Sequence, residues 1–173
     1  MTPLDFLDAL KDFLQREVAG TIWLQKEETE KRPEFVHPYV ECMYLPHKNF
    51  SPYEFQVPMI LASVDSITSG PESQTLEARL TLGTYGGGFY TVQGEKTKIP
   101  DAKGYRDLLN LAELCKQRLI GRSVIGGAGT IGLPVSAGVY DGELVYPYWY
   151  GFVQFTAEIP ANEYTDKEED YGI

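Results

Sequence analysis

The segment "TLEARLTLGTY", from Thr75 to Tyr85, decides the fold class of this 173-residue chain. Apolar side chains alternate with polar ones along it, and the apolar set is Leu76, Ala78, Leu80 and Leu82. An alternation of period two predicts a β-strand with one face against a core and the other toward solvent. Such a two-sided strand is typical of an antiparallel sheet.

Three other segments also have strand character. The segment "QVPMILASVDSI" (56–67) carries apolar residues on both faces, which predicts a central strand or one covered by helices. The segment "EFVHPYVECMYL" (34–45) predicts a strand that Pro38 interrupts. The segment "GELVYPYWYGFVQFTAEIP" (142–160) predicts either two strands joined near Pro147 or one bent strand.

Two segments have the apolar spacing of amphipathic helices. The first begins with Thr2 as a cap and Pro3 at the first helical position, and we expect it to stop at Gly20. The second has Asp101 as a candidate cap and Gly121 where a helix-terminating glycine belongs. Its buried face is predicted to carry Tyr105, Leu108, Leu109, Ala112, Cys115 and Leu119.

The order of helix, strands, helix and strands predicts an α+β fold. We expect a mostly antiparallel sheet of about four to six strands, with the two main helices packed on one face. Residues 1–160 are predicted to form a single domain, and residues 161–173 an acidic tail that is disordered or held only by a partner. The charged stretch 25–33 is predicted to be solvated, and the glycine-rich stretches 86–100 and 121–139 are predicted to be long loops.

Composition and charge narrow the class of protein. The net charge is −10, and Lys and Arg form no run, which argues against a nucleic-acid or anionic-membrane surface. The N-terminus lacks the basic region of a signal peptide, and no apolar run approaches membrane-spanning length. Cys42 and Cys115 are far apart and are expected to be free thiols. We therefore expect a soluble protein of the cytoplasm.

One glycine pattern has the spacing of a dinucleotide-binding turn. Gly127, Gly129 and Gly132 spell G-x-G-x-x-G, which binds a pyrophosphate only when a helix follows directly. Pro134 and Gly138 punctuate the segment that follows, and its apolar residues lack helical spacing. We therefore assign no cofactor to this chain.

The sequence also lacks a recognisable catalytic or metal-binding pattern. His37, Cys42 and His47 fit no common zinc spacing. There is no serine in a G-x-S-x-G turn and no phosphate-binding G-x-x-x-x-G-K-[ST] loop. We assign no catalytic and no metal-binding residue, and we expect a protein that acts by binding rather than an enzyme.

The densest aromatic run is "YPYWYGF" (146–152). Strand alternation sends part of it into the core, while Tyr and Trp are also enriched at protein interfaces. Stacking on sugars or bases is a further alternative. Tyr148 and Tyr150 are the interface candidates of this run.

Four segments together resemble a known family. They are "PMILASV" (58–64), "LTLGTY" (80–85), "GYRDLLNL" (104–111) and "PYWYG" (147–151). Their kind and order resemble the tail terminator, or tail completion, proteins, which are small minor tail proteins of long-tailed bacteriophages and prophages. The segments 23–50, 86–100 and 121–139 do not align with that pattern.

The resemblance implies an α+β structural protein that assembles as a six-fold ring, a homo-hexamer, on the tail. The ring would cap the tail tube, end its polymerisation and offer the head–tail joining surface to connector proteins. Assembly would take place in the host cytoplasm, and the protein would end in the virion tail or neck. The two glycine-rich stretches would order on assembly, with Tyr85, Phe89, Tyr90 and Ile125 as contact candidates. A head–tail connector or adaptor, and a small enzyme or ligand-binding domain with glycine-rich loops, stay open as alternatives.

Overall fold

The computed structural model describes residues 1–27, 34–46, 52–86, 89–91, 98–100, 103–141 and 145–161, with only the backbone at 89–91 and 98–100. Its helical elements are α1 (Pro3–Glu17), the short 3-10 helix η1 (Ala19–Thr21) and α2 (Tyr105–Arg122). The main sheet is built from β3 (Tyr39–Cys42), β4 (Met59–Ser69), β5 (Ser73–Tyr85), β8 (Val124–Ile125), β9 (Gly129–Val139) and β10 (Tyr148–Pro160). Two small hairpins add β1 (Leu24–Gln25) with β2 (Phe35–Val36), and β6 (Phe89–Thr91) with β7 (Lys98–Pro100).

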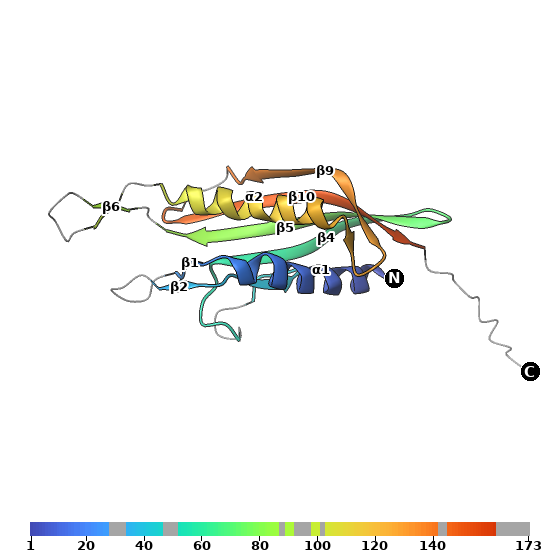
Figure 1. Cartoon of the computed structure of the whole chain (residues 1–173), viewed down its shortest axis with the longest axis horizontal. Helices are drawn as coiled ribbons and strands as arrows, with labels where there is room; N and C mark the ends of the chain where they lie inside the picture. The colour runs from blue at the N-terminus through green and yellow to red at the C-terminus, as the bar shows by residue number, and fades with distance from the viewer. Residues whose placement is uncertain are drawn as a thin grey trace, which may run out of the picture.

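The main sheet is six-stranded and mostly antiparallel, in the order β3-β4-β5-β10-β9-β8. Only the β3–β4 pair is parallel. Figure 1 shows the long strands β4, β5 and β10 side by side, with β1, β2 and β6 gathered at one end of them. The predicted α+β class with a mostly antiparallel sheet is confirmed, and β10 is one continuous strand.

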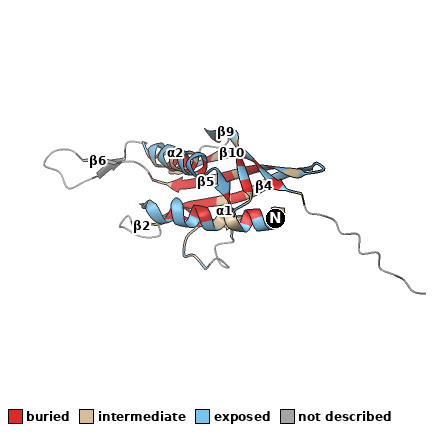
Figure 2. Cartoon of the chain, turned by 45° about the vertical axis from the view of Figure 1, so that its right-hand side comes forward, coloured by how far each residue is buried: buried red, intermediate tan, exposed pale blue. Residues whose placement is uncertain are grey.

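The alternation in β5 decides which face of the sheet is buried, as predicted. Leu76, Leu80 and Leu82 are fully buried, and Leu80 pairs with the equally buried Val153 of β10. We call this side the core face and the opposite side, which carries Arg79, the outer face. In Figure 2 the buried residues follow the long strands and the inner side of α1.

Each helix contacts its own part of the sheet. The start of α1 has the predicted cap, because the Thr2 hydroxyl accepts from the Asp5 N–H and the Asp5 carboxylate accepts from the Thr2 N–H. This helix contacts β3, β4 and β8, whereas α2 contacts β5, β9 and β10. Leu10 of α1 and Leu111 of α2 belong to one buried cluster with Leu80 of β5. One core therefore joins both helices to the sheet.

The helix ends differ in part from the expectation. The first helix ends at Glu17, and Gly20 lies in the following 3-10 turn. Asp101 lies outside the described residues, and α2 begins after Gly104 without a side-chain cap. Gly121 is not the terminating residue, because α2 continues to Arg122 and Ser123 caps it with a φ of 56°. The N–H of Ser123 donates to the carbonyl of Leu119, which closes the last turn.

The prediction of a loop at 121–139 is wrong. After α2 the chain forms β8, turns at Gly126 and Gly127 with φ of 61° and 79°, and continues as the long strand β9. Only glycine adopts such φ values readily, so this pair of residues sets the hairpin. The segment after the G-x-G-x-x-G spacing is thus a strand, in agreement with the expectation that no helix follows it. The other predicted loop, 86–100, contains the paired strands β6 and β7.

Because Leu80 fills the centre of the core face, we expect Leu80→Ala to lower the free energy of unfolding by about 2–5 kcal/mol. Leu109→Ala is the matched control, since Leu109 is 48% exposed on α2 and its loss should change stability by about 0.5 kcal/mol or less. Urea unfolding followed by circular dichroism measures both. Equal losses in the two variants would contradict the assignment of the core face.

Candidate functional site

A cluster of tyrosines lies on the outer face where β5 ends and β10 begins. The register pairs Tyr148 with Tyr85 and Tyr150 with Gly83. The Tyr85 and Tyr148 rings meet edge to face with centroids 5.1 Å apart, and those of Tyr148 and Tyr150 are parallel at 6.4 Å. A Cβ on Gly83 would stand 3.1 Å from the Tyr150 ring, so glycine leaves room for that ring to lie over β5.

A carboxylate is buried beside these rings. Glu27 follows β1, and its backbone N–H donates to the carbonyl of Val57 at 3.1 Å, which ties this segment to the start of β4. Its side chain accepts from the Gln56 N–H at 2.8 Å and from the Tyr148 hydroxyl at 3.1 Å. Glu27 is only 6% exposed, so these two donors replace the water that a surface carboxylate would bind.

Glu27 forms one wall of a surface pocket of about 270 Å³, which we call the Glu27 pocket. The pocket is lined by Glu27, Leu45, Gln56, Val57, Val145, Tyr148 and Tyr150. Its rim is apolar and open, because Leu45, Val145 and Tyr150 are 38%, 54% and 36% exposed. The centre of a protein interface is typically apolar and rich in aromatic side chains, and the exposed rim with Tyr150 has that composition.

The electrostatics of the pocket keep its tyrosines protonated. Burial, the Glu27 charge and the hydrogen bond to Glu27 together raise the pKa of Tyr148 to about 12. Burial and the same charge also raise the pKa values of Tyr39 and Tyr150. Tyr148 therefore remains a hydrogen-bond donor to Glu27 throughout the physiological range.

The structure brings three of the six interface candidates together. Tyr85, Tyr148 and Tyr150 lie in the tyrosine cluster, and Tyr148 and Tyr150 line the pocket. Ile125 is 2% exposed and belongs to the core, at the opposite end of the sheet, so its side chain offers a partner no surface. The side chains of Phe89 and Tyr90, on β6, lie outside the described residues.

The sequence did not indicate Glu27. It belongs to the charged stretch 25–33, which we expected to be solvated; the structure buries Gln25 and Glu27, whereas residues 28–33 lie outside the described part. The correction has a physical reason, because the β1–β2 hairpin holds this segment against Val57 and Tyr148. Leu45, Gln56 and Val145 were missed too, since each is a loop residue that gains its place only in the fold.

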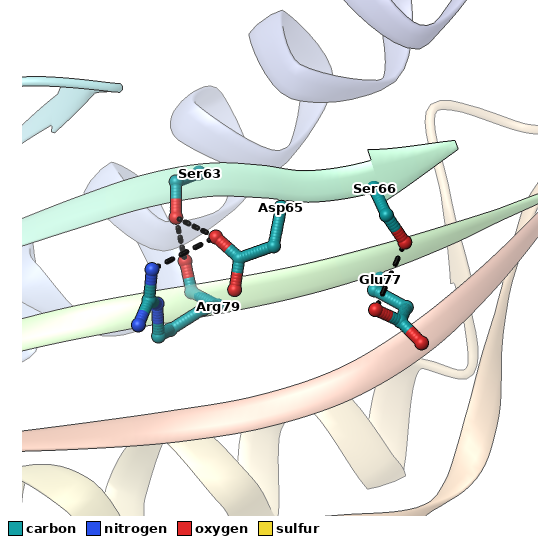
Figure 3. A network of polar contacts seen from close by, with 5 residues as sticks. All are labelled: Ser63, Asp65, Ser66, Glu77 and Arg79. Atoms are coloured by element: carbon teal, nitrogen blue, oxygen red, sulfur yellow. Dashed lines mark hydrogen bonds and ion pairs between the residues drawn. The ribbon is translucent and has the colours of Figure 1, made fainter.

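A second group of polar side chains lies on the outer face of β4 and β5 (Figure 3). Arg79 donates to Asp65 at 2.9 Å, and Ser66 donates to Glu77 at 2.9 Å. A bulge in β4 between Val64 and Ser66 places Asp65 here, next to a hollow of about 340 Å³ toward β9 and β10. The carboxylates are exposed and already paired, so the network is a solvated surface feature rather than an activated acid or base.

Two of the three residues considered for a metal lie in the described part, and His37 has other partners there. The His37 ring packs on Trp23 with centroids 3.7 Å apart, and its Nδ1 hydrogen-bonds to the Ile22 carbonyl at 2.8 Å. Cys42 is half-buried, and His47 lies outside the described residues. Within the described residues, no group of three or more His, Cys, Asp or Glu side chains could hold a metal ion.

Comparison with known proteins returns no match, either among models of protein families or among curated protein sequences. In the part of the chain that the structure describes, neither helix is long and apolar enough to cross a membrane.

Because Tyr148 donates to buried Glu27, we expect Tyr148→Phe to cost about 1–3 kcal/mol of stability near neutral pH. The folded-state pKa is raised above the ordinary value of 10.0, so this residue stabilises the fold fully below pH 10. That stabilisation is lost as the pH rises from 10 through about 12.

Urea unfolding between pH 7 and 12 tests this. Tyr146→Phe is the control, since Tyr146 is 49% exposed and its hydroxyl makes no hydrogen bond to the described residues. Tyr148→Phe should weaken the alkaline loss of stability, and Tyr146→Phe should leave it unchanged. An identical pH dependence in both variants would show that the Tyr148–Glu27 bond does not contribute.

Proposed function

We propose that this protein is a structural tail protein of a phage or prophage that acts by binding, without catalysis. It assembles as a six-fold ring, caps the tail tube, ends tail polymerisation and presents a joining surface to head–tail connector proteins. The observation that carries the proposal is the Glu27 pocket, whose open apolar rim has the composition of an interface centre. Its two tyrosines, Tyr148 and Tyr150, come from the segment 147–151, and Tyr85, which packs on Tyr148, comes from the segment 80–85. Both segments carry the family resemblance.

A ring needs two different surfaces on each copy that fit one another. One candidate surface follows the edge strand β3, where Met43 and Tyr44 are 59% and 72% exposed and lead to Leu45 at the pocket rim. The other lies along β8 and β9 at the opposite edge of the sheet, with Leu133 72% and Val139 44% exposed. Exposed apolar side chains on both edges support the proposal, because each copy then has two different surfaces to offer its neighbours.

We further propose that both helices cover the core face, so that the outer face and both sheet edges are left for partners. The shared core of Leu10, Leu111 and Leu80 supports this placement. The net charge of −10 keeps free copies apart and soluble in the host cytoplasm until a tail end offers a template. In the virion the protein would then lie at the joint between tail and neck.

The test is whether the protein caps tail tubes, observed by negative-stain electron microscopy with purified tubes. We expect ring-shaped density at one tube end, and we expect Val145→Glu, on the pocket rim, to abolish it. Ile67→Glu is the matched control, because Ile67 is 51% exposed near the β4–β5 turn, at the opposite end of the sheet. Both variants should stay folded by circular dichroism, since neither position belongs to the core.

Bare tube ends with the unaltered protein would overturn the terminator proposal. Capping that survives Val145→Glu but not Ile67→Glu would move the interface to the other end of the sheet. Binding to portal rings in place of tubes would identify a connector instead.

A further inference from the structure

Among the described residues, the carboxylate of Glu27 has neutral donors but no cation. Its partners are a backbone N–H and a tyrosine hydroxyl. The neighbouring Lys26 pairs with Glu34 and Glu54, and no lysine or arginine among the described residues forms an ion pair with Glu27. A buried charge without an opposite charge is costly, because the protein solvates it less well than water does. The described part of the pocket therefore supplies no positive group to balance Glu27.

We propose that the Glu27 pocket receives the guanidinium group of an arginine presented by a partner protein. The inference deepens the proposed function, on which it rests for the partner being another protein chain. A carboxylate offers about four acceptor positions, and the two donors occupy one on each oxygen of Glu27. The remaining positions can accept the paired N–H groups of a guanidinium.

The aromatic wall favours arginine over lysine. The Tyr148 and Tyr150 rings are parallel within 3°, and Tyr150 stands on the open rim. A flat guanidinium stacks on such a face and bonds to a carboxylate at its edge, whereas the round ammonium of lysine cannot do both. Arginine is also among the residues that contribute most at protein interfaces.

The size and the rest of the lining suit one long side chain. At about 270 Å³ the pocket exceeds the volume of one water several-fold and lies just below the roughly 300–1,000 Å³ of small-molecule sites. Leu45, Val57 and Val145 supply apolar walls for the methylene stem of an arginine. A whole cofactor would not be enclosed here.

The polar network on the outer face of β4 and β5 contains a carboxylate that is already paired with a guanidinium of the same chain. There Asp65 already has its guanidinium, because Arg79 donates to it at 2.9 Å. Glu17, Glu72 and Glu158, which line other hollows, are exposed to water and need no partner. Compared with these hollows, the Glu27 pocket is distinguished by a buried carboxylate that has no cation among the described residues.

The proposal is tested on the free chain with small probes, by two-dimensional NMR of the ¹⁵N-labelled protein. N-acetyl-arginine methylamide should shift the backbone signals around Val145 and Tyr150 and saturate. N-acetyl-citrulline methylamide has the same shape without the charge and should bind at least about tenfold more weakly, since a charge-assisted bond is lost. The lysine derivative should also bind more weakly than the arginine derivative.

Two variants locate the binding. Glu27→Gln keeps an acceptor for Gln56 and removes the charge, so it should weaken arginine binding about tenfold or more. Glu158→Gln removes an exposed carboxylate from the far end of β10 and should change nothing. Tyr150→Leu keeps the rim apolar but removes the flat ring, and should bring the arginine and lysine derivatives to similar affinity.

Equal binding of the arginine and citrulline derivatives to the unaltered protein would overturn the proposal, and that comparison needs no variant to fold. Equal binding of the arginine and lysine derivatives would overturn the assignment to a guanidinium group. Unchanged binding of the arginine derivative by folded Glu27→Gln would show that it does not bind in the Glu27 pocket. Because the probes need no tail tube, loss of arginine binding is separable from failure to cap tails.

Discussion

The pairing of β5 with β10 along their full length is the interaction on which the rest of the structure depends. Leu80 and Val153 face each other across it, and their neighbours at alternate positions continue the buried core face. β4 and β9 add to the two free edges of this pair, and α2, which lies between β5 and β10 in sequence, packs back on it. A one-residue slip in this register would turn every core side chain to the outer face. The same register brings Tyr148 to Tyr85 and Tyr150 to Gly83, so it also builds the tyrosine cluster.

The features that a short window of sequence encodes were predictable. The alternation in β5, the Thr2 cap of α1 and the interruption of the early strands at Pro38 all follow from local rules, and the structure has them. The strand β9 was missed because its glycines weaken local strand character. Its place is set from outside, by β10: a Cβ on Gly138 would meet the Phe152 ring at 2.6 Å, so glycine is what permits that packing.

The candidate site was predictable only in its aromatic half. Tyr148 and Tyr150 belong to a dense aromatic run that is visible in the sequence. Glu27 lies in a charged stretch that has the composition of a solvated turn. Its burial depends on a hydrogen bond to a residue 121 positions further along the chain. No local pattern carries such a contact.

The charge of Glu27 is the feature of this site that its contacts with the described residues do not explain. Neither of its hydrogen bonds requires a charge. The amide of a glutamine could accept from the Gln56 N–H through its oxygen and donate to the Tyr148 hydroxyl through its nitrogen. Replacing a buried ionic group by neutral or apolar ones is often neutral or stabilising, so the carboxylate is a poor device for stability alone. In the wall of an open apolar pocket, however, a buried negative charge would discriminate strongly between partners, because a partner without a matching group leaves it unpaired. Under the proposal that a partner's arginine binds here, the arrangement acts as a recognition element, in which stability is given up for selectivity.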